Sequence, residues 1–233
     1  MFTGIKKALR NFIVFAILVF LFAFGFKFFQ EFMTFRKIIQ NLKAESRIAE
    51  VLVTESSVDE YTRQYTTTIK FLEYDVKGNP LKAKYFTFKG NQIQFQTLVV
   101  RFNDKYIEEG HRMKGKSIYL FMKAFVLDGK NTQEFEITHR DGIPDGYRIS
   151  DAPNRFEREV WARFWKYALN PDERARVGIK NAQLEAPGSV FVPGTIYTLI
   201  IEHHGGIRID TRPIPQILKD ENLKATPVVQ QKN

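Results

Sequence analysis

The longest run of hydrophobic positions in the chain extends from Phe12 to Phe29. It reads FIVFAILVFLFAFGFKFF, and Lys27 is its only charged residue. Eighteen residues of α-helix extend for about 27 Å, close to the roughly 30 Å hydrocarbon core of a bilayer. Hydrophobic residues would cover every side of such a helix, which argues against a helix buried in a soluble core. The pattern therefore predicts a transmembrane helix over residues 12–29, with membrane lipid around it.

Charges beside this run predict its orientation. Residues 1–11 contain three basic residues and no acidic one, so we expect this segment to stay in the cytoplasm. The remainder of the chain would then be extracytoplasmic, in the periplasm beside the inner (plasma) membrane. A cleaved signal peptide is the alternative. The run is longer than a usual signal-peptide core, and bulky Phe residues occupy the place of a small-residue cleavage site. The sequence thus favours an uncleaved, single-pass signal anchor.

Apolar residues continue beyond the run at alternating four- and three-residue spacing. They are Phe28, Phe32, Phe35, Ile39 and Leu42. This is the spacing of a coiled-coil seam, sustained over two to three heptads. It predicts a juxtamembrane helical stalk over residues 30–46 that self-associates or packs against the membrane helix of a protein partner. The alternative is an amphipathic helix that packs back on its own domain.

From residue 47 the pattern changes to short strand-like runs separated by turn residues. The runs cover residues 47–54, 66–76, 81–88, 92–102, 117–127, 133–138, 196–202 and 207–210. The dipeptides Asp128-Gly129 and Gly205-Gly206 are typical of hairpin turns. The sequence therefore predicts a mainly β fold, an antiparallel sandwich or barrel-like domain over residues 47–212, followed by a flexible tail over 213–233.

One α-helix is predicted to interrupt these strands, near residues 155–169. Asn154 and Glu157 have the spacing of a capping box and mark its start. Apolar residues then recur at four-residue spacing, with Trp161 and Trp165 beside them. Such a stripe is typical of a helix that covers a sheet with its aromatic side chains in the core. The alternative is that Trp161 and Trp165 form a platform for a lipid, glycan or peptide.

Composition and charge narrow the classes of function. The 233 residues include 35 Lys and Arg against 26 Asp and Glu, a net charge of +9, and more than half of this excess lies in the first 45 residues. Basic residues placed beside a membrane segment suit anionic lipid headgroups, and we expect no nucleic-acid partner. The absence of Cys excludes disulfides, Cys-ligated metals and a thiol nucleophile.

Asp141 and Asp145 are weak candidates for metal ligands. They belong to the segment RDGIPDGY, whose DGIPD core resembles the calcium-binding repeats of the thrombospondin type-3 kind over about seven residues. That resemblance implies calcium held by carboxylate oxygens. Positions where the repeat would supply further ligands hold Ile137, His139 and Arg148. A tight turn is the alternative.

His203 and His204 are the second pair of weak metal candidates, beside Glu202. Neighbouring residues of a strand point to opposite faces, so one ion would reach both rings only if the chain bends there. A solvent-facing hairpin tip is the alternative. Sequence motifs of serine hydrolases, phosphate-binding loops and dinucleotide sites are missing. The sequence therefore favours a non-enzymatic protein and predicts no cofactor.

These observations together predict a membrane-anchored β-domain protein that acts as an interaction or assembly component of the cell envelope. One alternative is a membrane-tethered lipid- or glycan-binding domain whose pocket is closed by the tryptophan-bearing helix. A membrane-tethered hydrolase is a further alternative, because catalytic groups can assemble from distant positions.

Overall fold

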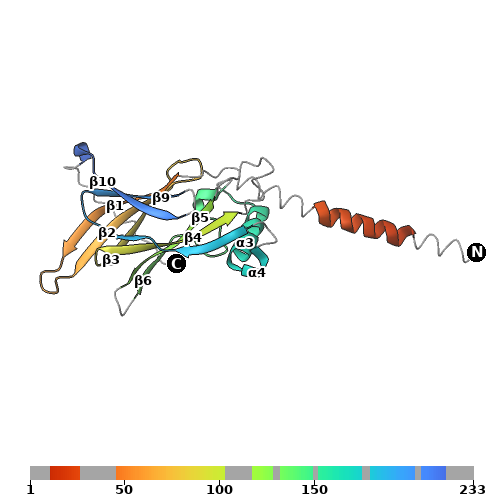
Figure 1. Ribbon diagram of the computed structural model, residues 1–233, viewed down its shortest axis with the longest axis horizontal. Coiled ribbons are helices and arrows are strands. Elements are labelled where there is room, and N and C mark those ends of the chain that lie inside the picture. Colours follow the sequence, from red (N-terminus) through yellow and green to blue (C-terminus); the bar gives the residue numbers. More distant parts are fainter. Residues whose placement is uncertain are drawn as a thin grey trace, which may run out of the picture. The chain divides into compact units, whose positions relative to one another are not determined.

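The computed structural model describes residues 11–26, 46–102, 117–127, 132–148, 152–174, 179–202 and 206–218. The chain divides into two compact units, residues 1–40 and 41–233. In the first unit, residues 11–26 form an α-helix whose side chains are all exposed (Figure 1). In the described ranges, no helix combines the length and the mean hydropathy of a membrane span. The predicted seam residues Phe28, Phe32, Phe35, Ile39 and Leu42 lie outside the described residues.

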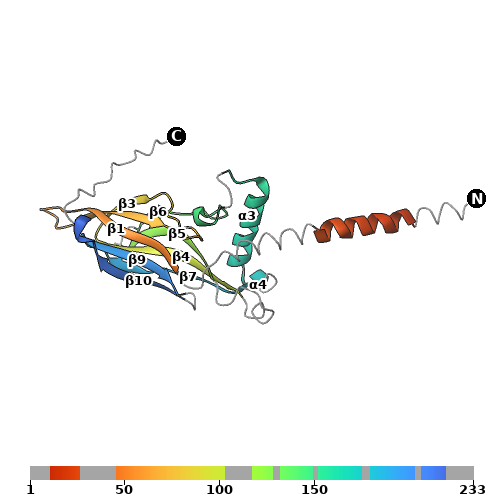
Figure 2. The same ribbon diagram turned by 90° about the horizontal axis from the view of Figure 1, so that it is seen from above.

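The second unit is built mainly of β-strands, as predicted, in two antiparallel sheets (Figures 1 and 2). In sheet 1 the strands follow the order β10-β9-β1-β2-β3, with bounds Ile207–Pro213, Thr195–Ile201, Ser46–Val58, Tyr65–Glu73 and Lys84–Lys89. In sheet 2 the order is β6-β5-β4-β7, with bounds Thr132–Glu136, Ser117–Leu127, Gln92–Phe102 and Ile179–Glu185, and the short β8, Gly188–Val190, pairs with β4. The two sheets remain separate, an arrangement consistent with a β-sandwich.

The main core lies between the two sheets and is centred on Phe71 of β2. Its ring lies 6.0 Å from the ring of Phe86 in β3, within the same sheet. From sheet 2, the rings of Phe95 and Phe121 each lie 5.1 Å away, one stacked and the other edge-on. Aromatic pairs at these distances add to the free energy gained by burial. Phe71 thus joins the two sheets.

Sheet 2 also carries a second buried region, next to helix α3. Strand β4 is buried at four consecutive residues, Thr97–Val100, and β5 at five, Ser117–Phe121. Neighbouring residues face opposite sides of a sheet, so both faces are covered here. Helix α3 (Arg155–Leu169) and the one-turn helix α4 (Pro171–Arg174) both lie against β7. Trp161, Phe164 and Trp165 of α3 are fully buried.

The predicted helix is confirmed, together with its start. Asn154 is the N-cap, and its side-chain oxygen accepts a hydrogen bond of 2.8 Å from the backbone N–H of Glu157. Strands β7 and β8 were not predicted. In β7 the half-buried positions are the polar Asn181, Gln183 and Glu185, whereas Leu184 is exposed, so its sequence lacks the usual alternation. Strand β8 has three residues, too few to show a pattern.

Replacement of Phe71 by Ala should lower the free energy of unfolding by about 3–5 kcal/mol, because it removes a ring shared by both sheets and leaves a cavity. Phe71→Leu should cost less, and Tyr61→Ala, at a position 97% exposed, should cost almost nothing. Urea unfolding of the full-length protein in detergent would measure these losses. If Phe71→Ala cost no more than Tyr61→Ala, Phe71 would not be the centre of the core.

Candidate functional site

Glu73 is the most unusual ionisable residue in the described part of the chain. It ends strand β2, where alternate residues from Thr67 onward point into the core. Ile69 and Phe71 occupy the two preceding inward positions, so the same alternation carries Glu73 into the interior, where it is 5% exposed. An isolated carboxylate is costly there unless it is paired or hydrogen-bonded. The surroundings of Glu73 therefore decide its chemical state.

A tight loop, residues 139–148, packs against Glu73. It includes the segment that resembles a calcium repeat, and it forms a turn in which the Gly142 N–H donates to the His139 carbonyl at 3.0 Å. A side chain at Gly142 would not fit, because its Cβ would lie 2.9 Å from that carbonyl oxygen. The preceding residue, Asp141, has a φ of 66°, a conformation that Asp tolerates better than most residues. The segment is thus an ordered turn, one of the two alternatives that the sequence allowed.

Contacts with three other elements hold this loop in place. The Gly146 carbonyl accepts a hydrogen bond of 3.3 Å from the N–H of Val76, just after β2. The Tyr147 hydroxyl accepts one of 3.2 Å from the backbone N–H of Tyr119 in β5. From α3, the Trp165 indole donates to the Gly142 carbonyl at 2.8 Å. We call the meeting point of β2, β3, β5 and this loop the Glu73 junction.

The carboxyl group of Glu73 has neighbours but no hydrogen-bond donor among the described residues. A Cβ placed on Gly146 would lie 3.5 Å from Glu73 Oε1, an ordinary contact distance, so this part of the loop is next to the carboxyl. Lys84 of β3 is the nearby cation, and its ammonium group donates to the Ile137 carbonyl at 2.7 Å and lies 3.5 Å from Asp145. Asp145 is also paired with Arg148 at 2.9 Å. Among the described residues, Glu73 therefore has no ion-pair partner of its own, and Lys84 acts on it only from a distance.

This environment raises the pKa of Glu73 from 4.5 to about 7. Burial is the main cause, the charge of Asp145 adds to it, and the charge of Lys84 opposes it. Burial also raises the pKa of the Tyr119 and Tyr147 hydroxyls, so both phenols are neutral at ordinary pH. The junction thus contains a carboxyl group that exchanges its proton near neutrality.

The positions of the predicted metal ligands do not favour a metal centre. Asp145 faces two cationic side chains, Lys84 and Arg148, where a calcium ligand would need further oxygens. Within the described ranges, no three His, Asp or Glu side chains are close enough together to hold a metal ion. His203 and His204 lie outside the described residues. Trp161 and Trp165 are described and fully buried, so they belong to the core and form no exposed platform.

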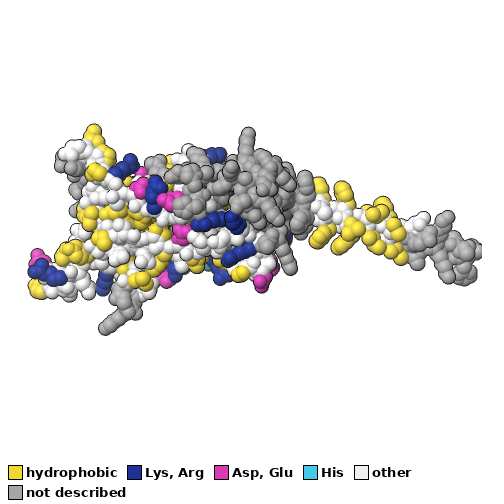
Figure 3. All heavy atoms as spheres, in the orientation of Figure 1, with side chains coloured by type: hydrophobic (Ala, Val, Ile, Leu, Met, Phe, Trp, Pro, Cys, Tyr) yellow, Lys and Arg dark blue, Asp and Glu magenta, His cyan; other side chains and the backbone are white. Residues whose placement is uncertain are grey.

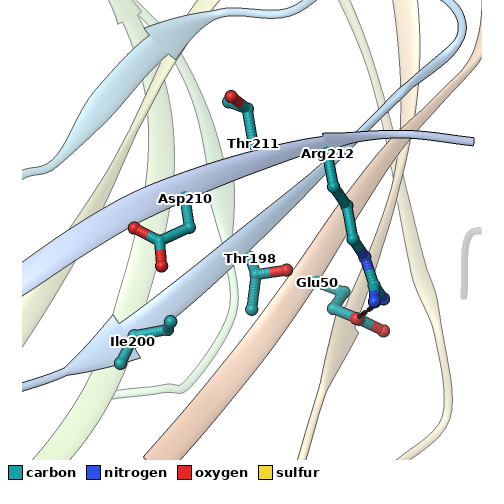
Figure 4. Close-up of a pocket in the computed structure, with 6 residues that line it drawn as sticks. All are labelled: Glu50, Thr198, Ile200, Asp210, Thr211 and Arg212. Atoms are coloured by element: carbon teal, nitrogen blue, oxygen red, sulfur yellow. Dashed lines mark hydrogen bonds and ion pairs between the residues drawn. The ribbon is translucent and has the colours of Figure 1, made fainter.

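A shallow depression on sheet 1 is the second candidate site (Figure 4). Its volume is about 210 Å³, and its lining residues are Glu50, Thr198, Ile200, Asp210, Thr211 and Arg212. Its charges are already paired: Arg212 donates to Glu50 at 2.7 Å, and Arg208 donates to Asp210 at 3.0 Å. The Tyr74 hydroxyl also donates to Glu50, at 2.6 Å. The depression therefore offers an ionic ligand little uncompensated charge.

At each edge of sheet 1, one backbone N–H donates to a side chain from sheet 2. The outward N–H of Ile207 in β10 donates to Glu185 at 2.9 Å, and the N–H of Lys89 in β3 donates to Gln133 at 3.0 Å. Because alternate residues face the same edge, Pro213 occupies a later outward position on β10, and it has no N–H to donate. Another strand could therefore form only a short run of backbone hydrogen bonds with β10. Natural sheets commonly avoid edge-to-edge pairing in this way.

Sequence reasoning missed the Glu73 junction. The signal was present, because Glu73 follows Ile69 and Phe71 at two-residue spacing and so belongs to the same face of the strand. The partners of Glu73 could not have been found in this way, since Lys84, Tyr119 and Asp145 come from elements whose pairing the sequence does not specify.

Comparisons with known proteins give no further guide to the site. No protein-family model matches the chain. Searches of curated proteins and of solved structures likewise return no match. A function must therefore be argued from the residues themselves.

The raised pKa of Glu73 predicts how stability depends on pH. Below about pH 4.5 Glu73 is protonated in both the folded and unfolded states, so its ionisation does not change the free energy of unfolding. Between pH 4.5 and about 7 the unfolded chain ionises first, so stability falls as pH rises. Above pH 7 the full destabilisation, about 3 kcal/mol, is present.

Glu73→Gln should therefore gain stability relative to the original protein as the pH rises from about 4 to about 8, by up to roughly 3 kcal/mol. Urea unfolding at a series of pH values would measure this difference, and any constant offset from burying an amide cancels in the comparison. Glu55→Gln, at an exposed position of β1, is the matched control. Parallel pH profiles for Glu73→Gln and the original protein would show that Glu73 ionises normally.

Proposed function

We propose that the protein is a single-pass membrane protein whose β-rich unit acts outside the cytoplasm as a non-enzymatic interaction or assembly component of the cell envelope. The observation that carries this proposal is the helix of residues 11–26. From Phe12 to Phe26 it contains no charged residue, and its side chains are all exposed, with Phe20 at 69% and Phe22 at 75% (Figure 3). So large an apolar surface is unfavourable in water and suits a bilayer.

The β-rich unit favours an interaction role over catalysis. In the depression around Glu50 and Arg212, the charges of the lining residues are paired with one another or with Arg208. The Glu73 carboxyl is closed in by the loop of residues 139–148, which leaves no open cleft at that acid in the described structure. The proposed contact with a partner or a second copy is the stalk seam of Phe28, Phe32, Phe35, Ile39 and Leu42.

The alternative of a lipid- or glycan-binding domain has weaker support. It requires Trp161 and Trp165 to face a ligand. Trp165 donates its indole N–H to Gly142, and Trp161 packs edge-on against Tyr147 with ring centres 5.5 Å apart. These contacts give both rings a structural role. The ligand-binding alternative would therefore need the helix to move away from the sheet.

Membrane anchoring predicts that the full-length protein resists extraction by carbonate and requires detergent. Replacing both Leu18 and Leu21 by Arg should release it, because each charge at the centre of a membrane helix costs about 2.5–3.5 kcal/mol. Replacing the same two residues by Ala is the matched control and should leave it in the membrane. Release of the original protein by carbonate alone would contradict the anchor.

The interaction role predicts a stoichiometric partner, or a second copy, in crosslinked and gently solubilised membranes. Replacing Phe32, Phe35, Ile39 and Leu42 by Ala should remove that partner, because these residues supply the apolar seam. Replacing Met33 and Ile38 by Ala is the matched control, because both are apolar but lie outside the seam spacing, and this variant should keep the partner. Mass spectrometry of the co-purified proteins is the measurement. A monomer with no partner, or a partner retained by the seam variant, would contradict this role.

A further inference from the structure

We propose that Glu73 is a proton-dependent latch, which holds the loop of residues 139–148, and through it helix α3, against the sandwich when its carboxyl is protonated. This inference does not depend on the membrane anchor or on the identity of any partner. It starts from the placement of a buried carboxyl group at the point where that loop meets strand β2.

Glu73 lies in contact with the loop of residues 139–148. Gly146 lies next to the carboxyl, since a Cβ placed on it would be 3.5 Å from Glu73 Oε1, and the Gly146 carbonyl accepts a hydrogen bond from Val76, three residues after β2. A neutral carboxyl can stay in this contact without water around it. An ionised carboxylate requires donors or water, and none of the described residues supplies a donor to it. Ionisation thus favours an arrangement in which the loop moves away and water enters.

Other ionisable groups face the Glu73 junction from each element packed against it. Strand β3 contributes Lys84, β5 contributes Tyr119, and the segment after β2 contributes Asp75. The loop itself contributes Asp145 and Tyr147. The phenols are neutral and Asp145 repels a second negative charge, which leaves Lys84 as the one cation of this group. Lys84 already donates to the Ile137 carbonyl and pairs with Asp145, so it compensates Glu73 only in part.

The loop is also linked to helix α3. Trp165 donates to the Gly142 carbonyl at one end of the loop. At the other end, Tyr147 packs against Trp161 at 5.5 Å and against Tyr119 at 5.9 Å. The helix therefore has two direct attachments to the loop, and the loop has a third contact with β5, so loosening the loop loosens the helix. With a pKa of about 7, Glu73 would make this change over the pH range near neutrality.

Hydrogen exchange of the full-length protein in detergent micelles tests the latch. After correction for intrinsic rates, peptides covering residues 139–148 and 155–169 should exchange faster at about pH 8 than at about pH 6, by roughly tenfold, because opening follows the ionised fraction. Peptides from β1, residues 46–58, should not change. Both tryptophans of the chain lie on α3, so their fluorescence should shift to longer wavelength over the same pH range.

Variants at Glu73, Asp145 and Lys84, with a control at Glu55, show whether the pH dependence comes from Glu73. Glu73→Gln should remove the pH dependence and keep the loop closed, whereas the exposed control Glu55→Gln should behave as the original protein. Asp145→Asn should move the midpoint to lower pH, and Lys84→Gln should move it to higher pH, because the two charges act on Glu73 in opposite directions. A pH dependence retained in Glu73→Gln, or absent from the original protein, would overturn the latch. If Glu73→Gln failed to fold, unshifted midpoints in Asp145→Asn and Lys84→Gln would also overturn the latch.

Discussion

Strand β2 imposes the constraint on which most of this structure depends. Its strict alternation turns Thr67, Ile69, Phe71 and Glu73 toward the same side. Phe71 is thereby brought against rings from both sheets and joins the two halves of the sandwich. A shift of one residue in the pairing of β2 would send all four side chains to the opposite face, so the register is strongly specified. The same register forces an acidic residue into the interior, two positions beyond the centre of the core.

The interior position of Glu73 explains why the neighbouring loop is built as it is. Gly146 lies next to the carboxyl, Gly142 allows the tight turn, and Tyr147 accepts a hydrogen bond from β5. Trp165 then attaches helix α3 to the same loop. Burying a carboxyl without a donor costs stability at neutral pH, and most cores avoid it. The structure thus connects a titratable group with the packing of its main helix, which is the physical basis of the proposed latch.

Much of the β-rich fold could be predicted from the sequence, because strands with one buried face show alternation. Strands β4 and β5 have the bounds that their apolar runs predict, and Asn154 begins α3 as its capping pattern indicates. Strand β7 could not be found in this way, since its half-buried positions are polar and its Leu184 is exposed. The candidate site was less predictable than the fold. Asp141 and Asp145 drew attention as possible metal ligands, while the residue with the perturbed pKa, Glu73, lies in a strand that reads as ordinary core.

The proposed role in the envelope and the latch meet in the β-rich unit, which would be exposed to the pH of its compartment. The central claim is that Glu73 remains buried and exchanges its proton near neutrality in the folded protein. The most direct measurement is an NMR titration of the Glu73 side-chain carboxyl carbon, assigned by comparison with Glu73→Gln. Our account predicts a midpoint at about pH 7. A midpoint near the ordinary glutamate value of 4.5 would contradict it.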